Sequence, residues 1–186
     1  VNEMLDLAKL ESDHMELQLL RSDVIPFLKY LCESFQSLAG GKQIKLSIQT
    51  DIDCLVMDFD SKKLETIVSN LLSNAIKFTE QGYVTLNVSV LDMPDSATDG
   101  LPARIRFEVV DTGIGIAPAD RERLFEPFER IDTHLRVKAG GTGLGLYIVQ
   151  QTVVRVLNGD IRLDTSPGEG VTFTTYLPDM GEATDE

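Results

Sequence analysis

Two asparagines and a lysine recur at helical spacing in the middle of the chain. Asn70, Asn74 and Lys77 are four and three residues apart, which places them on one face of a predicted helix. Asparagine weakens helix interiors because its side chain competes for backbone hydrogen bonds. An amide oxygen can, however, hold Mg²⁺ while phosphates and waters complete its octahedron. We interpret Asn70 and Asn74 as metal ligands and Lys77 as a phosphate contact; the alternative is an ordinary solvated face.

An aspartate followed by two glycines comes directly after an apolar segment, in the stretch Asp111-Thr112-Gly113-Ile114-Gly115-Ile116. A carboxylate at a strand end can accept a hydrogen bond from an exocyclic amine, such as the amino group of adenine. Glycines let the backbone approach a base closely. The competing interpretation is a simple turn, because Asp/Gly turns are common.

Four glycines precede another predicted helix, in the stretch Gly140-Gly141-Thr142-Gly143-Leu144-Gly145-Leu146. Free backbone N–H groups and the helix dipole together favour an anion there. The stretch lacks the Lys-Ser or Lys-Thr of a P-loop, and it is not G-x-G-x-x-G because residue 146 is leucine. A flexible loop leading into a helix is the alternative.

The connection between the two glycine stretches is aperiodic and rich in cations. It carries FEPF at residues 125–128, then Arg130, and then His134 close to the glycines. We predict that residues 129–141 form a lid over bound phosphates, anchored by Phe125 and Phe128. These phenylalanines are equally typical of an ordinary core.

The elements that must position these groups follow from hydrophobic periodicity. We expect helices near residues 1–13, 22–41, 60–78, 118–124 and 142–157, and strands near 16–20, 44–48, 83–91, 104–110, 160–165 and 171–177. The second helix should turn Phe35 and Leu38 inward. Two tight strand–turn–strand pairs indicate antiparallel pairing. We therefore predict an α/β fold, a two-layer sandwich with a mixed, mostly antiparallel sheet, helices on one face and a helix fragment in front.

Composition excludes several classes of protein. The net charge of −13 argues against nucleic-acid binding. Cys32 and Cys54 lack metal-ligand spacing, which favours reduced structural thiols in the cytoplasm. No apolar run reaches membrane-span length, and there is no signal peptide. The start at Val1 rather than Met suggests an excised piece, and membrane anchoring of the full-length protein is left open.

Taken together, the motifs resemble one family. NLLSNAIKFT resembles the asparagine box of sensor histidine kinases, DTGIGI their first glycine box, FEPF their phenylalanine box and GGTGLGL their second glycine box. Residues 1–15 resemble the end of the second dimerisation helix and its linker, 16–179 the catalytic domain with its closing hairpin, and 180–186 an acidic tail. The resemblance covers nearly the whole chain, and four boxes in the same order make it specific.

The resemblance implies a catalytic domain that binds ATP and Mg²⁺. Asn74 would be the principal metal ligand, Asn70 would support metal or phosphates, and Lys77 and Arg130 would contact phosphate. Phe78 would flank the nucleotide, and Asp111 would bind the adenine amine in a pocket shaped by Gly113, Gly115 and Ile116. The phosphates would lie against Gly141, Thr142, Gly143, Leu144, Gly145 and Leu146. Thr172 would back the adenine pocket through a water.

The family's phosphoacceptor histidine is missing from this chain. His14 falls in the linker and His134 in the lid, and neither has the acidic residue that follows the phosphoacceptor. The resemblance therefore implies an upstream dimerisation domain that carries the histidine, a downstream response regulator or receiver domain, and a homodimeric full-length protein. The alternatives are an ATPase conformational switch, whose water-activating glutamate would have to be Glu65, or a nucleotide-binding scaffold.

Overall fold

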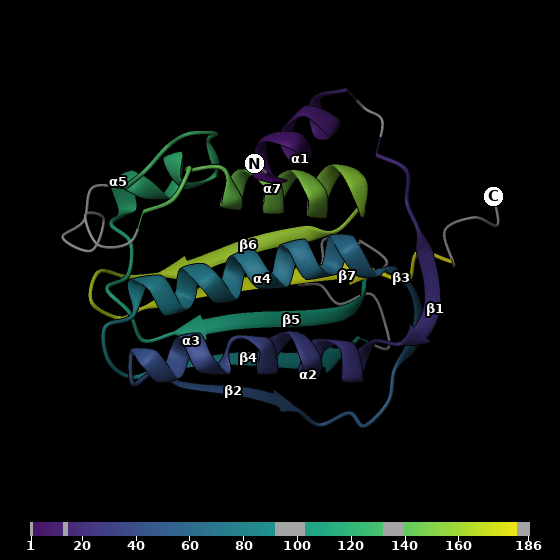
Figure 1. Cartoon of the computed structure of the whole chain (residues 1–186), viewed down its shortest axis with the longest axis horizontal. Helices are drawn as coiled ribbons and strands as arrows, with labels where there is room; N and C mark the ends of the chain where they lie inside the picture. The colour runs from purple at the N-terminus through teal and green to yellow at the C-terminus, as the bar shows by residue number, and fades with distance from the viewer. Residues whose placement is uncertain (1, 13–14, 92–102, 132–139, 182–186) are drawn as a thin grey trace.

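A computed structural model describes residues 2–12, 15–91, 103–131 and 140–181. Its main sheet has five strands in the order β2-β4-β5-β7-β6, with β2 parallel to β4 and the other pairs antiparallel. The strands are β2 (Lys45–Thr50), β4 (Tyr83–Val90), β5 (Ala103–Asp111), β6 (Asp160–Thr165) and β7 (Val171–Pro178). Helices α2 (Val24–Ser34), α4 (Ser61–Phe78) and α7 (Gly145–Gln151) lie on one face of this sheet (Figure 1). The predicted two-layer sandwich is confirmed.

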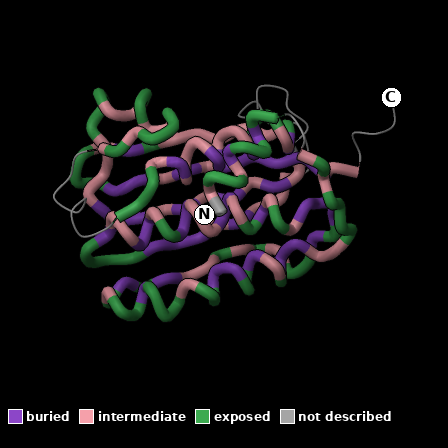
Figure 2. The backbone as a smooth tube through the Cα atoms, turned by 45° about the horizontal axis from the view of Figure 1, so that its top comes forward, coloured by how far each residue is buried: buried purple, intermediate pink, exposed green. Residues whose placement is uncertain are grey.

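Helix α4 is the central element between the sheet and the site. Asp60 caps its start by accepting hydrogen bonds from the backbone of Lys62 (3.0 Å) and Lys63 (3.1 Å). Its apolar stripe is buried in the core that it shares with β4 and β5, and consists of Leu64, Ile67, Val68, Leu71, Leu72, Ala75 and Ile76. Figure 2 shows buried backbone along the interface between the two layers. Each buried aliphatic side chain stabilises the fold by roughly 1.5–3 kcal/mol, which fixes the rotation of α4 about its axis.

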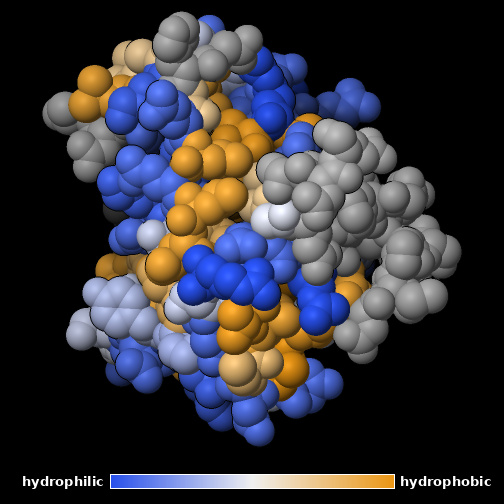
Figure 3. All heavy atoms as spheres, turned by 90° about the vertical axis from the view of Figure 1, so that its right-hand side faces the viewer, coloured by the Kyte–Doolittle hydropathy of each residue, from blue (hydrophilic) through white to orange (hydrophobic). Residues whose placement is uncertain are grey.

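A second, two-stranded sheet lies at the edge of the molecule. It pairs β1 (Leu19–Asp23) with β3 (Val56–Asp60) antiparallel. Strand β1 begins three residues later than predicted, and β3 was not predicted. Leu19 and Leu20 on β1 and Val56 on β3 are apolar but exposed, which blurs the alternation of apolar and polar residues by which a strand is identified in a sequence. Figure 3, which views the molecule from that side, shows apolar residues grouped among hydrophilic ones.

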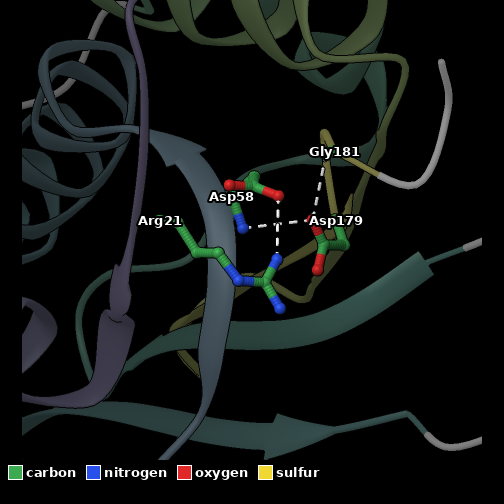
Figure 4. A network of polar contacts seen from close by, with 4 residues as sticks. All are labelled: Arg21, Asp58, Asp179 and Gly181. Atoms are coloured by element: carbon green, nitrogen blue, oxygen red, sulfur yellow. Dashed lines mark hydrogen bonds and ion pairs between the residues drawn. The ribbon is translucent and has the colours of Figure 1, made fainter.

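Polar contacts tie this small sheet to the end of β7 (Figure 4). Arg21 on β1 forms an ion pair with Asp58 on β3 at 3.0 Å. Asp179 accepts hydrogen bonds from the backbone N–H groups of Asp58 (3.1 Å) and Gly181 (3.0 Å). The exposed ion pair alone contributes about 0–1 kcal/mol, so the backbone hydrogen bonds define this junction.

Three predicted helices differ from those observed. The helix expected over residues 22–41 breaks at Phe35, giving α2 and a separate α3 (Gln36–Gly41), and Leu38 is exposed rather than inward. The hydroxyl of Ser34 donates to the Leu31 carbonyl at 2.6 Å, and the Phe35 N–H bonds to Cys32 instead. The side chain thus competes for the acceptor that a continuing helix would use.

The second difference lies before α7, which begins at Gly145 rather than Thr142. Gly140, Gly141 and Gly143 have φ of 56°, 120° and 77°, values that an α-helix does not allow. Helix α7 continues into a π-helical turn, η3 (Thr152–Val156).

The remaining elements are short. The predicted helix at 118–124 is split into α5 (Pro118–Arg121) and a 3₁₀ turn, η2 (Arg123–Phe125). At the start of the chain α1 (Asn2–Glu11) packs Leu7 and Leu10 against α7. Over the described ranges, no helix combines the length and the apolar character that a membrane span requires.

Candidate functional site

One cavity of about 320 Å³ brings the separate motifs together. It lies between α4, the loop after β5 and the glycine stretch before α7. The predicted residues that line it are Asn70, Asn74, Lys77, Phe78, Asp111, Gly115, Ile116, Arg130, Gly141, Thr142, Gly143, Gly145 and Leu146. Segments more than 60 residues apart in the sequence thus face a single space.

The amide side chains on α4 face the glycine stretch. The Asn70 amide nitrogen donates to the Thr66 carbonyl at 2.8 Å. A Cβ atom added at Gly145 would lie 2.7 Å from the Asn70 amide oxygen, so that oxygen points toward the start of α7. Asn74 is half-buried in the cavity wall one turn further along α4. Both amides are therefore placed to offer oxygen to a cation that also binds a ligand in the cavity.

Positive charge gathers at the same end of the cavity. Lys77 donates a hydrogen bond to the Gly140 carbonyl, and its Nζ atom lies 5.1 Å from the ring centroid of Phe78. Burial lowers the pKa of Lys77, and the neighbouring Arg130 guanidinium lowers it further. An anion in the cavity would relieve the repulsion between these two cations.

A buried carboxylate lines the cavity at the end of β5. Asp111 is 7% exposed, and its Oδ1 atom accepts hydrogen bonds from the backbone of Gly113 (2.8 Å) and Val171 (3.2 Å). Both hydrogen bonds that this carboxylate accepts from described residues fall on Oδ1, which leaves Oδ2 for a donor on a ligand. Burial raises the pKa of Asp111 to about 6, and the two backbone N–H groups partly oppose that rise.

Glycine is required where the loop after β5 passes its neighbours. Gly115 has φ of 68°, and a Cβ atom there would overlap the carbonyl of Ser166. A Cβ atom at Gly113 would lie 2.9 Å from Asp111 Oδ1 and would also overlap the Phe78 carbonyl. Gly113 does not line the cavity; its backbone N–H donates to Asp111 Oδ1 and so helps to position the carboxylate.

Two further predicted site residues do not line the cavity. Leu144 is fully buried and packs with Leu7, Leu10 and Ile148, so its side chain serves the core. Thr172 lies between Val171 and Phe173, which both line the cavity. Because successive residues of a strand face opposite sides of the sheet, the Thr172 side chain points to the other face. The interpretation of Thr172 as a backing residue is therefore corrected.

The lining residues that were not predicted are Glu3, Ser73, Ala75, Arg123, Leu124, Val171 and Phe173. Ile114, Glu129, Ile131 and Gly140 also line the cavity and belong to the predicted glycine motifs and lid segment. Strand alternation places Val171 and Phe173 on one face of β7, but it does not tell which face meets the cavity. Local sequence held no signal for Glu3, whose carboxylate accepts a hydrogen bond from Thr142 and acts electrostatically on Lys77.

The other residues named in the predictions lie either away from the cavity or outside the described residues. Glu65 is exposed and does not line the cavity. The central part of the predicted lid, with His134, and also His14 lie outside the described residues.

The arrangement suits a ligand with an amine-bearing ring at one end and negative charge at the other. Within the described ranges, no cluster of three histidine, cysteine or acidic side chains could hold a metal alone. A divalent cation held by the Asn70 and Asn74 oxygens would therefore need oxygen ligands from the bound molecule.

Asp111 makes the free protein less stable above pH 6. Its pKa of about 6 exceeds the ordinary 3.8, so the native state binds more protons than the unfolded chain between these values. Stability therefore rises as pH falls through this window, and the full cost of the buried charge applies above it. We expect Asp111→Asn, whose amide oxygen can still accept both N–H groups, to be more stable at pH 7.5 by about 1–3 kcal/mol.

Urea unfolding of both proteins between pH 4 and pH 8 measures this difference, which should shrink toward pH 4. Asp164→Asn on β6, where the side chain is exposed, is the matched control. A pH-independent difference between Asp111→Asn and the wild type would contradict the prediction.

Sequence comparison relates the chain to known proteins. Residues 59–180 match the protein-family model described as histidine kinase-, DNA gyrase B-, and HSP90-like ATPase. The circadian input-output histidine kinase CikA of Synechococcus elongatus is 36% identical over 183 residues, which are 97% of this chain and 23% of CikA. The signal transduction histidine-protein kinase BarA of Escherichia coli is 36% identical over 95% of this chain and 19% of its own length.

Solved structures give the same picture. Full-length ShkA in complex with AMPPNP superposes with a TM-score of 0.79 at 31% identity, over 95% of this chain and 34% of ShkA. The catalytic domain of histidine kinase ThkA has a TM-score of 0.71 at 22% identity, over 88% of this chain and 99% of that domain, which shows the shared fold. The chain thus spans less than a quarter of the curated relatives named above.

Proposed function

Since the chain belongs to the histidine kinase-, DNA gyrase B- and HSP90-like ATPase family, among the catalytic domains of histidine kinases, we propose that it binds Mg·ATP and donates the γ-phosphoryl group to a histidine outside this chain. The observation that carries the proposal is the pairing, in one cavity, of the buried Asp111 carboxylate with the Asn70, Asn74 and Lys77 side chains.

The adenine end of ATP would lie at Asp111. The free Oδ2 atom would accept a hydrogen bond from the adenine amine, while Ile116, Phe78 and Phe173 supply apolar surface around the ring. Desolvation in this position makes a charge-assisted hydrogen bond more valuable than in water.

The phosphate end would lie between α4 and the glycine stretch. Lys77, Arg130 and the backbone of residues 140–145 would hold the phosphates by charge and N–H donation. Asn70 and Asn74 would hold Mg²⁺ through their amide oxygens, and this ion would neutralise charge on the phosphates. Phosphoryl transfer needs positioning and charge stabilisation more than covalent help from the protein, and these residues supply both.

The attacking histidine would come from a dimerisation and histidine-phosphotransfer domain upstream. Residues 1–15 would be the end of its second helix and the linker, and residues 16–179 the catalytic domain. A receiver domain or response regulator downstream would accept the phosphoryl group, and the full-length protein would be a homodimer. The named kinases are several times longer than this chain, which supports further domains. A switch ATPase is not favoured, since Glu65 is exposed and does not line the cavity.

Radiolabelled ATP tests the proposal. The chain alone should acquire no acid-labile phosphate, whereas a mixture with a dimeric helical hairpin that carries a phosphoacceptor histidine should acquire it on the hairpin. A hairpin with that histidine changed to glutamine is the control. Stoichiometric acid-labile phosphate on the isolated chain, lost on His14→Gln or His134→Gln, would contradict an external acceptor.

Glu3 should weaken ATP binding in this chain. Its carboxylate occupies the phosphate end of the cavity, where it bonds to Thr142 and acts on Lys77. We expect Glu3→Gln to raise ATP affinity by about two- to fivefold, the size of a partly exposed charge interaction. Calorimetric titration with Mg·ATP measures it, with Glu11→Gln, exposed at the other end of α1, as the matched control. Equal affinity of both variants would show that Glu3 does not compete with phosphate.

A further inference from the structure

The last turn of α4 has a donor for each of its final four carbonyl groups. A helix end leaves such acceptors without intrahelical partners. Here the Ala75 carbonyl accepts from the Thr79 hydroxyl at 2.7 Å, and the Phe78 carbonyl accepts from the Ile114 N–H at 3.3 Å. The carbonyl groups of Ile76 and Lys77, which lie between these two in the sequence, both accept from a single side chain. That side chain lies outside the helix and does not line the cavity.

That side chain is Lys42. Its Nζ atom donates to the carbonyls of Ile76 at 2.6 Å and Lys77 at 3.0 Å. An ammonium group at this place also lies at the negative end of the helix dipole, which favours a cation. Hydrogen bonds to a charged donor are the stronger kind, so Lys42 contributes more here than a neutral cap would.

The turn that carries Lys42 is itself held firmly. Its backbone closes through hydrogen bonds from Lys42 to Ala39 and from Gln43 to Gly40, each 3.0 Å, and Gln43 has φ of 58°. The N–H of Lys45 then bonds to the Gly82 carbonyl at 3.1 Å at the start of the β2–β4 pair. Lys42 therefore links the edge of the sheet to α4 from a turn that is held by backbone hydrogen bonds. Its side chain does not line the cavity.

The turn of α4 that Lys42 holds carries two ligand-facing side chains. Lys77 reaches from this turn to the Gly140 carbonyl, and Phe78 lines the cavity next to it. The Phe78 carbonyl also bonds to Ile114 in the loop after Asp111. A shift of this turn would therefore disturb both ends of the cavity.

We propose that Lys42 is a positioning residue for nucleotide binding, which acts by fixing the last turn of α4 and thereby holding Lys77 and Phe78 at the cavity. The role rests on the proposed function, because it presupposes that ATP occupies the cavity. Lys42 itself touches neither nucleotide nor metal.

Calorimetric titration with Mg·ATP tests the role in three variants. Lys42→Met keeps most of the side-chain length without the charge, and Lys42→Arg keeps charge and donors. Lys45→Met, three residues on and exposed, is the matched control. We expect Lys42→Met to bind ATP about five- to tenfold more weakly, Lys42→Arg to recover most of that loss, and Lys45→Met to bind as the wild type does.

A double-mutant cycle with Lys77→Ala separates positioning from a general loss of stability. If Lys42 acts through Lys77, Lys42→Met should cost about twofold or less in the Lys77→Ala background. The same loss in both backgrounds, or wild-type affinity in Lys42→Met, would overturn the role while leaving ATP binding intact. Absence of ATP binding by the wild type would instead overturn the proposed function and this role with it. Lys42→Gln replaces Lys42→Met if thermal unfolding shows that the latter is not folded.

Discussion

Asp111→Ala is expected to weaken ATP binding by more than tenfold. The substitution removes a hydrogen-bond acceptor from a position that is 7% exposed, where water cannot replace it. Loss of a hydrogen bond to a charged group costs roughly 1.5–3 kcal/mol, and 1.4 kcal/mol is a factor of ten. Calorimetric titration with Mg·ATP at pH 8, above the pKa of about 6, measures the effect on the ionised carboxylate.

Comparing the affinities for ATP and GTP tests the contact between Asp111 and the base more directly. The Asp111 carboxylate would accept a hydrogen bond from the adenine amine, whereas guanine presents a carbonyl oxygen at the corresponding place. Asp111→Asn retains the contacts to Gly113 and Val171 but can donate as well as accept, so it should lower the preference for ATP over GTP. The wild-type preference should also fall below pH 6, as Asp111 becomes protonated. An unchanged ATP:GTP ratio in Asp111→Asn would show that the base lies elsewhere.

Asn74→Ala should weaken ATP binding by about tenfold with Mg²⁺ present and far less with EDTA. The amide oxygen of Asn74 would be a metal ligand, so its loss matters only when the metal links protein and phosphates. Without this ligand, water and phosphate oxygens would still coordinate the ion. We therefore expect a loss of binding free energy close to that of one hydrogen bond to a charged group, about 1.5 kcal/mol. Titrations in both conditions give the ratio directly.

Ser73→Ala is the matched control, because Ser73 lines the cavity from the same helix without an amide oxygen. It should change ATP affinity little in either condition. Equal losses for Asn74→Ala with Mg²⁺ and with EDTA would show that Asn74 contacts the nucleotide rather than the metal.

Much of the site was predictable because its residues recur at regular spacing. Asn70, Asn74 and Lys77 share a helical face, and the apolar stripe opposite them shows which face is buried. Thr172 was assigned from the family resemblance alone, and the register of β7 against β5 places its side chain on the face of the sheet away from the cavity. Local periodicity states that residues alternate but does not state which set faces the ligand.

The contacts that could not be predicted are those between distant segments. Glu3 reaches Thr142 because α1 packs on α7 through Leu7 and Leu10, and nothing near Glu3 in the sequence indicates this. Lys42 reaches the end of α4 across 34 residues. Strand β3 escaped notice because it has only five residues and begins with the apolar but exposed Val56.

The contacts that fix both ends of α4 restrict which insertions and deletions the protein can tolerate. Asp60 fixes its first turn and Lys42 its last, and the core and the ligand use opposite faces in between. One inserted or deleted codon would rotate everything beyond it by about 100°, turning Asn74 and Lys77 out of the cavity or apolar residues into it. Insertions and deletions should therefore be absent from residues 60–79 of functional descendants, however freely point substitutions accumulate on the solvent side of this helix.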